Sequence, residues 1–416
     1  MIVAVAIFAA ALALIATDRV DRTKVALAGG VLMLVTQTID QERAVLAIDF
    51  NTIGLLAGMM IMVRLTEATG VYSWLAIHVA RLSRGRPPLL VALLAAFTGV
   101  LSAFLDNVTT VLLVVPVTFL LADALEIDAI PLVIIEVLVS NVGGTATLIG
   151  DPPNILIAGH TDLSFVAFIA NLAPISALVL VVITAGLYAG YRGRLRVAPG
   201  ARRRVLALDP RAAIEDAAEL RRTVPILVAT ILAFFAHKLL HLEPATVALA
   251  GAAAMLLVSR EPVADALGGI EWPTLFFLVG LFVMVGALDE QGALASVTDG
   301  IAAVTGGDRT AELLAIVWLS GVGGALVDNI PFTAAMIPVV DPLAAAGGDA
   351  YWWALALGAC YGGNGTLVAA AANVAAAGMA ARARRPIGFL AFLRAGVPVT
   401  LVSLLLASGY VLLRYA

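Results

Sequence analysis

The chain has 416 residues, of which 62% are hydrophobic and 13% are charged, and its mean hydropathy is +1.02. Soluble domains carry about 25% charged residues, so this composition excludes an ordinary soluble protein and predicts an all-α polytopic membrane protein. The formal net charge of −4 says little, because the positions of charges matter more than their sum in such a protein.

The residues that commonly bind metals are sparse. The only cysteine, Cys360, excludes an internal disulfide and a thiolate metal cluster within one chain. Of the four histidines, His237 and His241 have an HxxxH spacing, but no HExxH motif is present, and we expect no transition-metal site and no cofactor. No nucleotide-binding motif is present, so any ATPase would be a separate subunit, and we expect no nucleic-acid partner.

The first apolar run covers residues 2–16 and has no basic residue before it. The nearest positive charges, Arg19, Arg22 and Lys24, all follow the run. This order predicts a first transmembrane helix with its N-terminus outside, and not a cleaved signal peptide.

Further apolar segments follow in both halves of the chain. We expect them at 24–38, 51–69, 89–105, 108–122, 130–158, 164–190, 223–238, 246–259, 272–288, 311–327, 330–346, 352–380 and 387–413. In two places an Asp-Asn pair joins neighbouring segments with almost no loop. These places predict re-entrant hairpins at 89–122 and 311–346, whose tips stop inside the membrane against protein or a watery cavity.

The positions of lysine and arginine support these hairpins. If each hairpin enters and leaves on one side, each half has five crossings and most of the 25 Lys and Arg residues lie inside. If the hairpins spanned, the arginine-rich linker 191–222 would lie opposite the Arg19–Lys24 loop. The hairpin topology places both termini outside and the linker in the cytoplasm. We expect the protein to lie in the cell (inner) membrane.

The two halves resemble each other in sequence. Asp106-Asn107 and Asp328-Asn329 lie 222 residues apart, and each pair has a proline ten residues after its aspartate. An odd number of crossings per half gives the halves opposite orientations, as in transporters with inverted repeats. We therefore expect an N-terminal repeat (1–190) with a broken helix at 130–158, and a C-terminal repeat (223–416) with a broken helix at 352–380.

The hairpin tips combine carboxylate, amide and hydroxyl groups. An Asp at membrane depth costs about 2.5–3.5 kcal/mol, so two copies indicate a binding site for a small ion. Asp106 and Asn107, together with Asn141, suit Na⁺, and an aspartate can also carry a proton. The alternative is that Asp106 only caps the following helix.

Two glycine pairs are expected to break helices near the tips. Gly143-Gly144 lies in the phrase SNVGGTATLIGDPPN, and Gly362-Gly363 precedes Asn364 and Thr366. Such breaks free backbone groups that bind ions, whereas the alternative is close packing of helices.

Two further acids lie near the first glycine pair. Glu136 is a candidate proton carrier, with pairing to an arginine as the alternative. Asp151, followed by two prolines, is interpreted mainly as a helix end.

The phrases FLDNVTTVLLVVPVT and DFNTIGLLAGMMIMV, with the glycine-pair phrase, resemble the ion-transporter superfamily, specifically the group of ArsB arsenite permeases, NhaD sodium/proton antiporters and P proteins. The resemblance implies a homodimer in membrane lipid that works by an elevator movement. It also implies binding residues at Asp106, Asn107, Thr109, Asn141, Gly143, Gly144, Thr145, Asp328, Asn329, Gly362, Gly363, Asn364 and Thr366. Dicarboxylate-carrying relatives have Ser-Asn-Thr tips, so the Asp-Asn tips argue against that substrate, and Pro331 stands where the first tip has Thr109.

The predicted function is ion-coupled secondary transport of a small inorganic ion, with H⁺ or Na⁺ as coupling ion. Proton-coupled arsenite or antimonite export comes first, and Na⁺/H⁺ antiport or anion transport like that of P proteins is the alternative. A passive channel and an intramembrane aspartyl protease are remote alternatives, and the Gly-x-Gly-Asp motif of that protease is absent. We therefore expect no enzyme and no catalytic residue.

Overall fold

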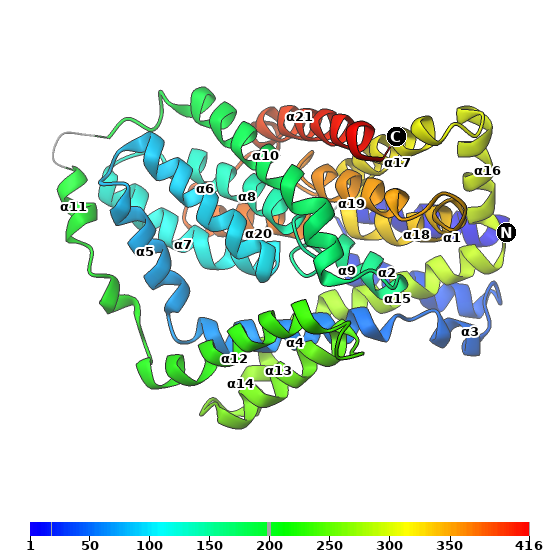
Figure 1. The fold of residues 1–416 in the computed structure, drawn as a ribbon, viewed down its shortest axis with the longest axis horizontal. Coiled ribbons are helices and arrows are strands. Elements are labelled where there is room, and N and C mark those ends of the chain that lie inside the picture. Colours follow the sequence, from blue (N-terminus) through cyan, green and yellow to red (C-terminus); the bar gives the residue numbers. More distant parts are fainter. Residues whose placement is uncertain (18, 198–200, 416) are drawn as a thin grey trace.

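The computed structural model describes residues 1–17, 19–197 and 201–415, and all regular elements in these ranges are helices (Figure 1). The first half contains α1 (Ile2–Ala16), α2 (Arg22–Val35), α3 (Gln41–Leu46), α4 (Phe50–Glu67), α5 (Val71–Leu82), α6 (Pro87–Phe104), α7 (Asn107–Leu125), α8 (Ala129–Gly144), α9 (Pro152–His160) and α10 (Phe165–Tyr191). The linker contains α11 (Ala201–Ala207) and the 3₁₀ helix η1 (Pro210–Ala213). The second half contains α12 (Ala217–Ala236), α13 (Pro244–Val258), α14 (Val263–Gly268), α15 (Trp272–Glu290), α16 (Ala293–Thr305), α17 (Arg309–Leu326), α18 (Asn329–Gly347), α19 (Ala350–Gly362), α20 (Ala371–Arg382) and α21 (Phe389–Tyr415).

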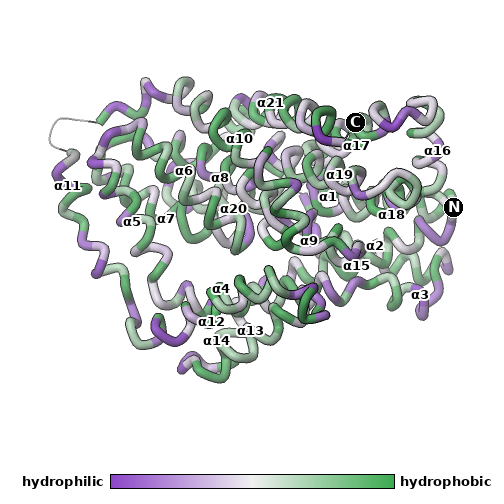
Figure 2. The backbone as a smooth tube through the Cα atoms, in the orientation of Figure 1, coloured by the Kyte–Doolittle hydropathy of each residue, from purple (hydrophilic) through white to green (hydrophobic). Residues whose placement is uncertain are grey.

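The helices have the length and composition of membrane spans. Within the described residues, seven are long and apolar enough to cross a membrane, and the bent pair α4–α5 would make an eighth span. Figure 2 shows hydrophilic residues gathered around α3 and α11, at opposite ends of the molecule's long axis. The prediction of an all-α polytopic membrane protein is confirmed.

The order of helices in α1–α10 recurs in α12–α21. The halves also exchange equivalent contacts, because α2 packs against α15 while α13 packs against α4. Small residues make both contacts close: a Cβ on Gly280 would lie 2.4 Å from the Ala26 backbone, and one on Gly58 would lie 2.7 Å from that of Ala248. Such reciprocal contacts are typical of two copies related by a two-fold axis. The opposite orientation of the halves in the membrane stays a prediction.

The pair α6–α7 doubles back on itself at Asp106. Leu90, near the start of α6, and Leu125, at the end of α7, belong to one buried cluster that also contains Val205 of the linker. The same end carries an ion pair between Arg204 and Glu126 with a 2.6 Å separation. The hairpin and the linker therefore meet at one end of the molecule. The depth of the tip in the membrane stays a prediction.

Both long apolar segments after the hairpins are broken, as expected, but the break follows the glycine pair. α8 ends at Gly144 before α9 begins, and α19 ends at Gly362 before α20 begins. A Cβ on Gly143 would lie 2.3 Å from the carbonyl oxygen of Gly99, and one on Gly362 would lie 2.5 Å from that of Gly321. For Gly143 and Gly362, the packing alternative therefore describes the structure.

The expected segments did not include α5 and α16. α4 and α5 are bent by 67° where they meet, so α5 turns away from α4, α12 and α13 toward α6 and α7 (Figure 1). The charged or polar side chains of Ser73, His78 and Arg81 lower the hydropathy of α5, which is why a search for apolar runs passes over it. α5 thus connects the layer of α4, α12 and α13 to the hairpin.

Candidate functional site

Both tip aspartates cap the helix that follows them. The carboxylate of Asp106 accepts a hydrogen bond from the Thr109 N–H at 2.8 Å, and that of Asp328 accepts one from the Ile330 N–H at 3.0 Å. The helix capping considered as an alternative for Asp106 is therefore present at both tips. Asp328 has a second role, because its other oxygen forms an ion pair with Arg22 of α2 at 3.0 Å. This ion pair joins the second tip to a helix of the other half.

Asn107 and Asn329 of the two tips meet at a third acid, Asp151. The Asn107 Nδ2 group donates to Asp151 Oδ1 at 3.1 Å, and Asn329 Nδ2 donates to the same oxygen at 3.5 Å. Asp151 is fully buried and its side chain forms no capping bond to α9. The expectation that Asp151 mainly ends a helix is therefore incomplete, since its carboxylate joins the two tips.

Asn141 joins the two broken helices to this centre. Its Oδ1 accepts a hydrogen bond from Asn107 Nδ2 at 3.0 Å, while its Nδ2 donates to Asn364 Oδ1 at 2.9 Å and to Asn373 Oδ1 at 3.0 Å. We call the connected set of side chains the polar cluster; its members are Asn107, Asn141, Asp151, Asn329, Asn364 and Asn373. Each member is at most 3% exposed. Both hairpins and both broken helices therefore contribute to one buried hydrogen-bonded network.

Two completely buried acceptor atoms of the polar cluster have no hydrogen bond within the described part of the chain. They are Asn107 Oδ1 and Asp151 Oδ2. The other polar atom of Asn107, Nδ2, already donates to Asn141 and Asp151, so the amide cannot turn without losing these bonds. Leaving a buried acceptor unsatisfied costs about 1–3 kcal/mol, and more for a carboxylate. The arrangement suits a ligand that brings a proton, hydroxyl donors or a cation.

A cavity of about 30 Å³ lies beside the polar cluster, between the tips and helices α2, α4 and α15. Its lining includes Asp106, Asn107, Asp151 and Asn329, together with Glu271 and Arg22. Arg22 also lies over the ring of Phe277, with 5.3 Å between the guanidinium carbon and the ring centroid. This volume exceeds the 10–15 Å³ that one water needs. Three acidic side chains against one arginine make the lining net acidic.

Some predicted site residues use their polar groups elsewhere. The hydroxyl of Thr145 donates to the carbonyl of Asn141 at 2.8 Å, and that of Thr366 donates to the carbonyl of Ala325 at 2.8 Å. The Thr109 hydroxyl donates to Asp106 at 2.6 Å. These threonines hold the breaks and the first tip in shape. Gly144 lies against the carbonyl of Gly150, and Gly363 lies against the amide of Asn329.

Glu136 is buried but does not reach the polar cluster through any hydrogen bond in the described structure. One of its oxygens accepts a hydrogen bond from the Thr118 hydroxyl at 2.5 Å, and the other has no partner there. Its partner is thus a hydroxyl and not the arginine considered as an alternative. Its role as a proton carrier stays a prediction.

Sequence reasoning missed three contributors to this region, Asn373, Arg22 and Glu271, and it gave Asp151 a lesser role than the structure does. Asn373 had a signal, because it aligns with Asn154 at an offset of 219 residues, and both asparagines donate to the backbone of the preceding break. Asp151 had no such sequence signal, because the residue 219 positions after it is Ala370. Arg22 and Glu271 lie near helix starts, where a charge is ordinary.

Comparisons with known proteins point to membrane transporters. The profile of the family described as "CitMHS: Citrate transporter" matches residues 12–358. An uncharacterised transporter of Mycobacterium tuberculosis (strain ATCC 25618 / H37Rv) is 42% identical, covering 100% of this chain and 98% of its own length. The human P protein is 33% identical over 99% of this chain, which spans 60% of the length of that protein. Among solved structures, the YdaH transporter of Alcanivorax borkumensis has the same fold, with a TM-score of 0.60, 16% identity, and coverage of 88% of this chain and 84% of that one.

Proposed function

The chain belongs to the CitMHS family of transporters, and on this premise we propose that it is a proton-coupled secondary transporter of a small inorganic solute, which binds at the polar cluster. Arsenite or antimonite, carried outward, is the first candidate solute. Arsenous acid is neutral near pH 7 and carries three hydroxyl groups. The coupling proton is carried by a carboxylate of the cluster or of the tips.

The observation that carries the proposal is the pair of acceptors without hydrogen bonds, Asn107 Oδ1 and Asp151 Oδ2. A neutral solute with hydroxyl donors satisfies both, and so does a proton on Asp151 combined with one donor to Asn107. Binding and protonation then compete for the same carboxylate. Such competition exchanges a proton for a solute as the site faces first one side and then the other.

Charge and size argue against a tricarboxylate at this site, although the family carries the name of citrate. The lining is net acidic, and a citrate anion brings further acceptors where the cluster already has unmatched ones. A cavity of about 30 Å³ in this conformation fits a species of a few atoms. Arg22 is the cation in this lining, and it is already paired with Asp328.

Na⁺/H⁺ antiport is the second candidate, because carboxylate and amide oxygens also suit a hard cation. Of the Na⁺ ligands expected at Asp106, Asn107 and Asn141, only Asn107 has a side-chain oxygen without a hydrogen bond in the described structure. We propose Asp151 as the second ligand of such a site. Anion transport like that suggested by the P-protein likeness has less support, because the lining is net acidic.

We further propose that a homodimer in the inner membrane moves its hairpins and broken helices, elevator-like, against a scaffold that contains α2, α4, α13 and α15. The contact of Arg22 with Asp328 crosses this boundary. Moving one elementary charge across 100 mV supplies about 2.3 kcal/mol, enough for tens-fold accumulation or expulsion.

The test is proton movement in proteoliposomes with a trapped pH dye, to which arsenite, antimonite, Na⁺, Li⁺, chloride and citrate are added in turn. We expect a saturable pH change with arsenite or antimonite, at least tenfold smaller in Asp151→Asn and reduced in Asp106→Asn and Asp328→Asn. Asp265→Asn, which removes an exposed acid of α14, should behave like the original protein.

A pH change with Na⁺ and Li⁺ alone would show that the transported solute is a cation and not arsenite or antimonite, while proton coupling would still hold. A response that survives in Asp151→Asn, or flux that does not saturate, would rule out coupling through the polar cluster.

A further inference from the structure

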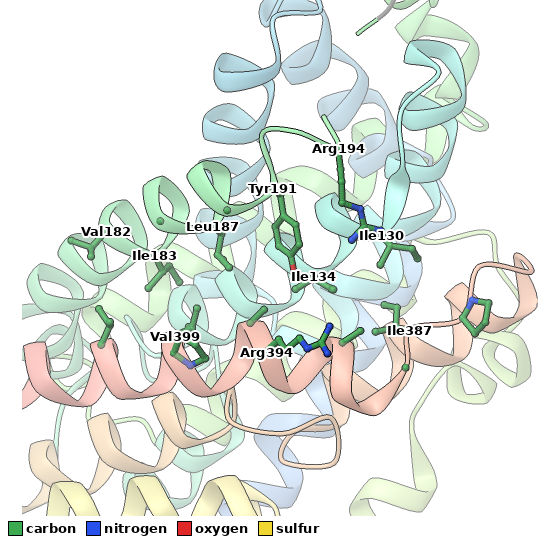
Figure 3. A pocket seen from close by; sticks show the side chains of 18 residues that line it. Ile130, Ile134, Val182, Ile183, Leu187, Tyr191, Arg194, Ile387, Arg394 and Val399 are labelled. Atoms are coloured by element: carbon green, nitrogen blue, oxygen red, sulfur yellow. The ribbon is translucent and has the colours of Figure 1, made fainter. Parts of the chain in front are cut away.

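A second, larger recess lies away from the polar cluster, between α10 and α21 (Figure 3). Its volume is about 690 Å³, and Ile130 and Ile134 of α8 contribute to its lining. Most of the remaining lining is aliphatic and comes from the two long helices. We call this recess the α10–α21 groove. None of its lining residues belongs to the polar cluster or to the cavity beside it.

Two arginines and a tyrosine gather at one end of the groove. Figure 3 shows Arg194, Tyr191 and Arg394 toward this end and Val182 toward the other. Arg194 is already engaged, because its guanidinium donates to Asp128 at 3.0 Å. Arg394, on the second turn of α21, forms no hydrogen bond or ion pair with any described residue, and the groove lining contains no acidic residue. The polar end thus carries an unmatched positive charge.

The groove has the length of one lipid leaflet. From Tyr191 to Val182, α10 rises by nine helical steps, or about 14 Å at 1.5 Å per step. Half of a hydrocarbon core of about 30 Å is about 15 Å. Gly186 and Gly190 line this stretch, and nothing lies within 4 Å of a Cβ placed on either. These glycines leave room along α10 for an extended chain of methylene groups.

The polar end of the groove lies on the side of the protein that is expected to carry most of the basic residues. α10 ends at Tyr191, just before the arginine-rich linker, and α21 begins at Phe389, just after Arg382, Arg384 and Arg385. An arginine on a membrane helix is costly unless an anion or water reaches it, and a phosphate accepts two parallel hydrogen bonds from a guanidinium. The cytoplasmic leaflet supplies anionic headgroups at this level.

We propose that the α10–α21 groove binds one anionic phospholipid, with its phosphate on Arg394 and one acyl chain along Gly186 and Gly190. Charge complementarity favours a lipid over a second copy of the chain. A second copy that docked through the same groove would bring arginines against Arg394, because the lining has no acid to offer. A zwitterionic lipid fills the apolar part equally well but neutralises Arg394 less completely. The proposal is independent of the transported solute.

The experiment measures lipid adducts of the detergent-purified full chain by native mass spectrometry, with phosphatidylglycerol and phosphatidylcholine of identical acyl chains as probes. We expect one tightly held phosphatidylglycerol per chain, with an affinity at least about fivefold above that for phosphatidylcholine. Arg394→Gln should abolish this preference, and Gly186→Phe should remove the adduct by filling the groove. Glycerol phosphate, which has the headgroup without acyl chains, should not compete at equal concentration.

Two control variants match these changes. Arg384→Gln removes a nearby exposed charge, and Gly409→Phe adds a ring at an open position of α21. Neither residue lines the groove. Both should keep the preference for phosphatidylglycerol. Equal binding of the two lipids, an unchanged preference in Arg394→Gln, or a lipid-free dimer that Gly186→Phe dissociates would each overturn the proposal.

Discussion

The two hairpin tips carry the same Asp-Asn pair, yet their carboxylates have different partners. At the first tip, Thr109 gives Asp106 both an N–H bond at 2.8 Å and a hydroxyl bond at 2.6 Å. At the second tip, the equivalent residue is Pro331, which has neither an N–H nor a hydroxyl group. Asp328 therefore caps the residue before it, Ile330, and takes Arg22 as its other partner.

This difference shows how a repeated motif acquires two roles. The first carboxylate is satisfied by its own helix, so the first tip keeps its hydrogen bonds wherever it moves. The second is satisfied by α2 of the other half, at a sequence separation of 306 residues. Any movement of the second tip away from α2 has to break an ion pair. The two tips are thus expected to respond differently to substitution.

The largest expected effect comes from Arg22→Gln. This change leaves the carboxylate of Asp328, a buried residue, without its cation, and breaking such a pair costs about 3 kcal/mol. The figure is at the lower end of the range for buried pairs because 26% of the Arg22 side chain is exposed. Thermal unfolding of the detergent-solubilised protein measures the loss. Lys24→Gln, an exposed charge on the same helix, should have little effect, and adding Asp328→Asn to Arg22→Gln should restore most of the stability.

Thr109→Val should destabilise the first tip by a smaller amount, about 1.5 kcal/mol, because Asp106 loses the hydroxyl bond and keeps the backbone cap. The same unfolding measurement compares it with Thr161→Val, which removes a hydroxyl that bonds only the helical carbonyl of Ile157. If both variants lose the same stability, the Asp106 carboxylate gains nothing special from Thr109.

The smallest effect tests the origin of the asymmetry directly. Pro331→Thr gives the second tip the residue of the first, so it should recover about 1 kcal/mol of the stability lost in Arg22→Gln. Pro331→Val restores the N–H without the hydroxyl and should recover less. A double-mutant cycle on thermal unfolding separates the two contributions. If neither substitution recovers stability in the Arg22→Gln background, the proline is not the reason for the ion pair.

The helices and the internal repeat were predictable because their signals are local. Long apolar runs, the Asp-Asn pairs and the glycine pairs each lie in continuous sequence, and the structure places helix ends at or next to them. α5 and α16 escaped prediction because they mix polar and apolar residues, and the hydropathy of a segment does not reveal amphipathic helices that pack on the protein itself.

The candidate site was predicted only in part. Asn107, Asn141, Asn329 and Asn364, which the family resemblance implied as binding residues, do lie in one hydrogen-bonded network. Asp151 was interpreted mainly as a helix end because two prolines follow it, whereas in the structure these prolines begin α9. Nothing in the neighbouring sequence reveals that its side chain turns away from α9 and toward both tips.

The sequence by itself determined where helices form, where they break and which breaks carry polar groups, because hydropathy, helix propensity and capping act over a few residues. Only the tertiary structure decided which polar groups share one space. Asp151 meets Asn329 across 178 residues, and Arg22 meets Asp328 across 306. These contacts depend on how the two halves pack, and α2 against α15 and α4 against α13 approach closely through small residues of both halves. The partners of a buried charge are set by that packing, since no local preference acts over such separations.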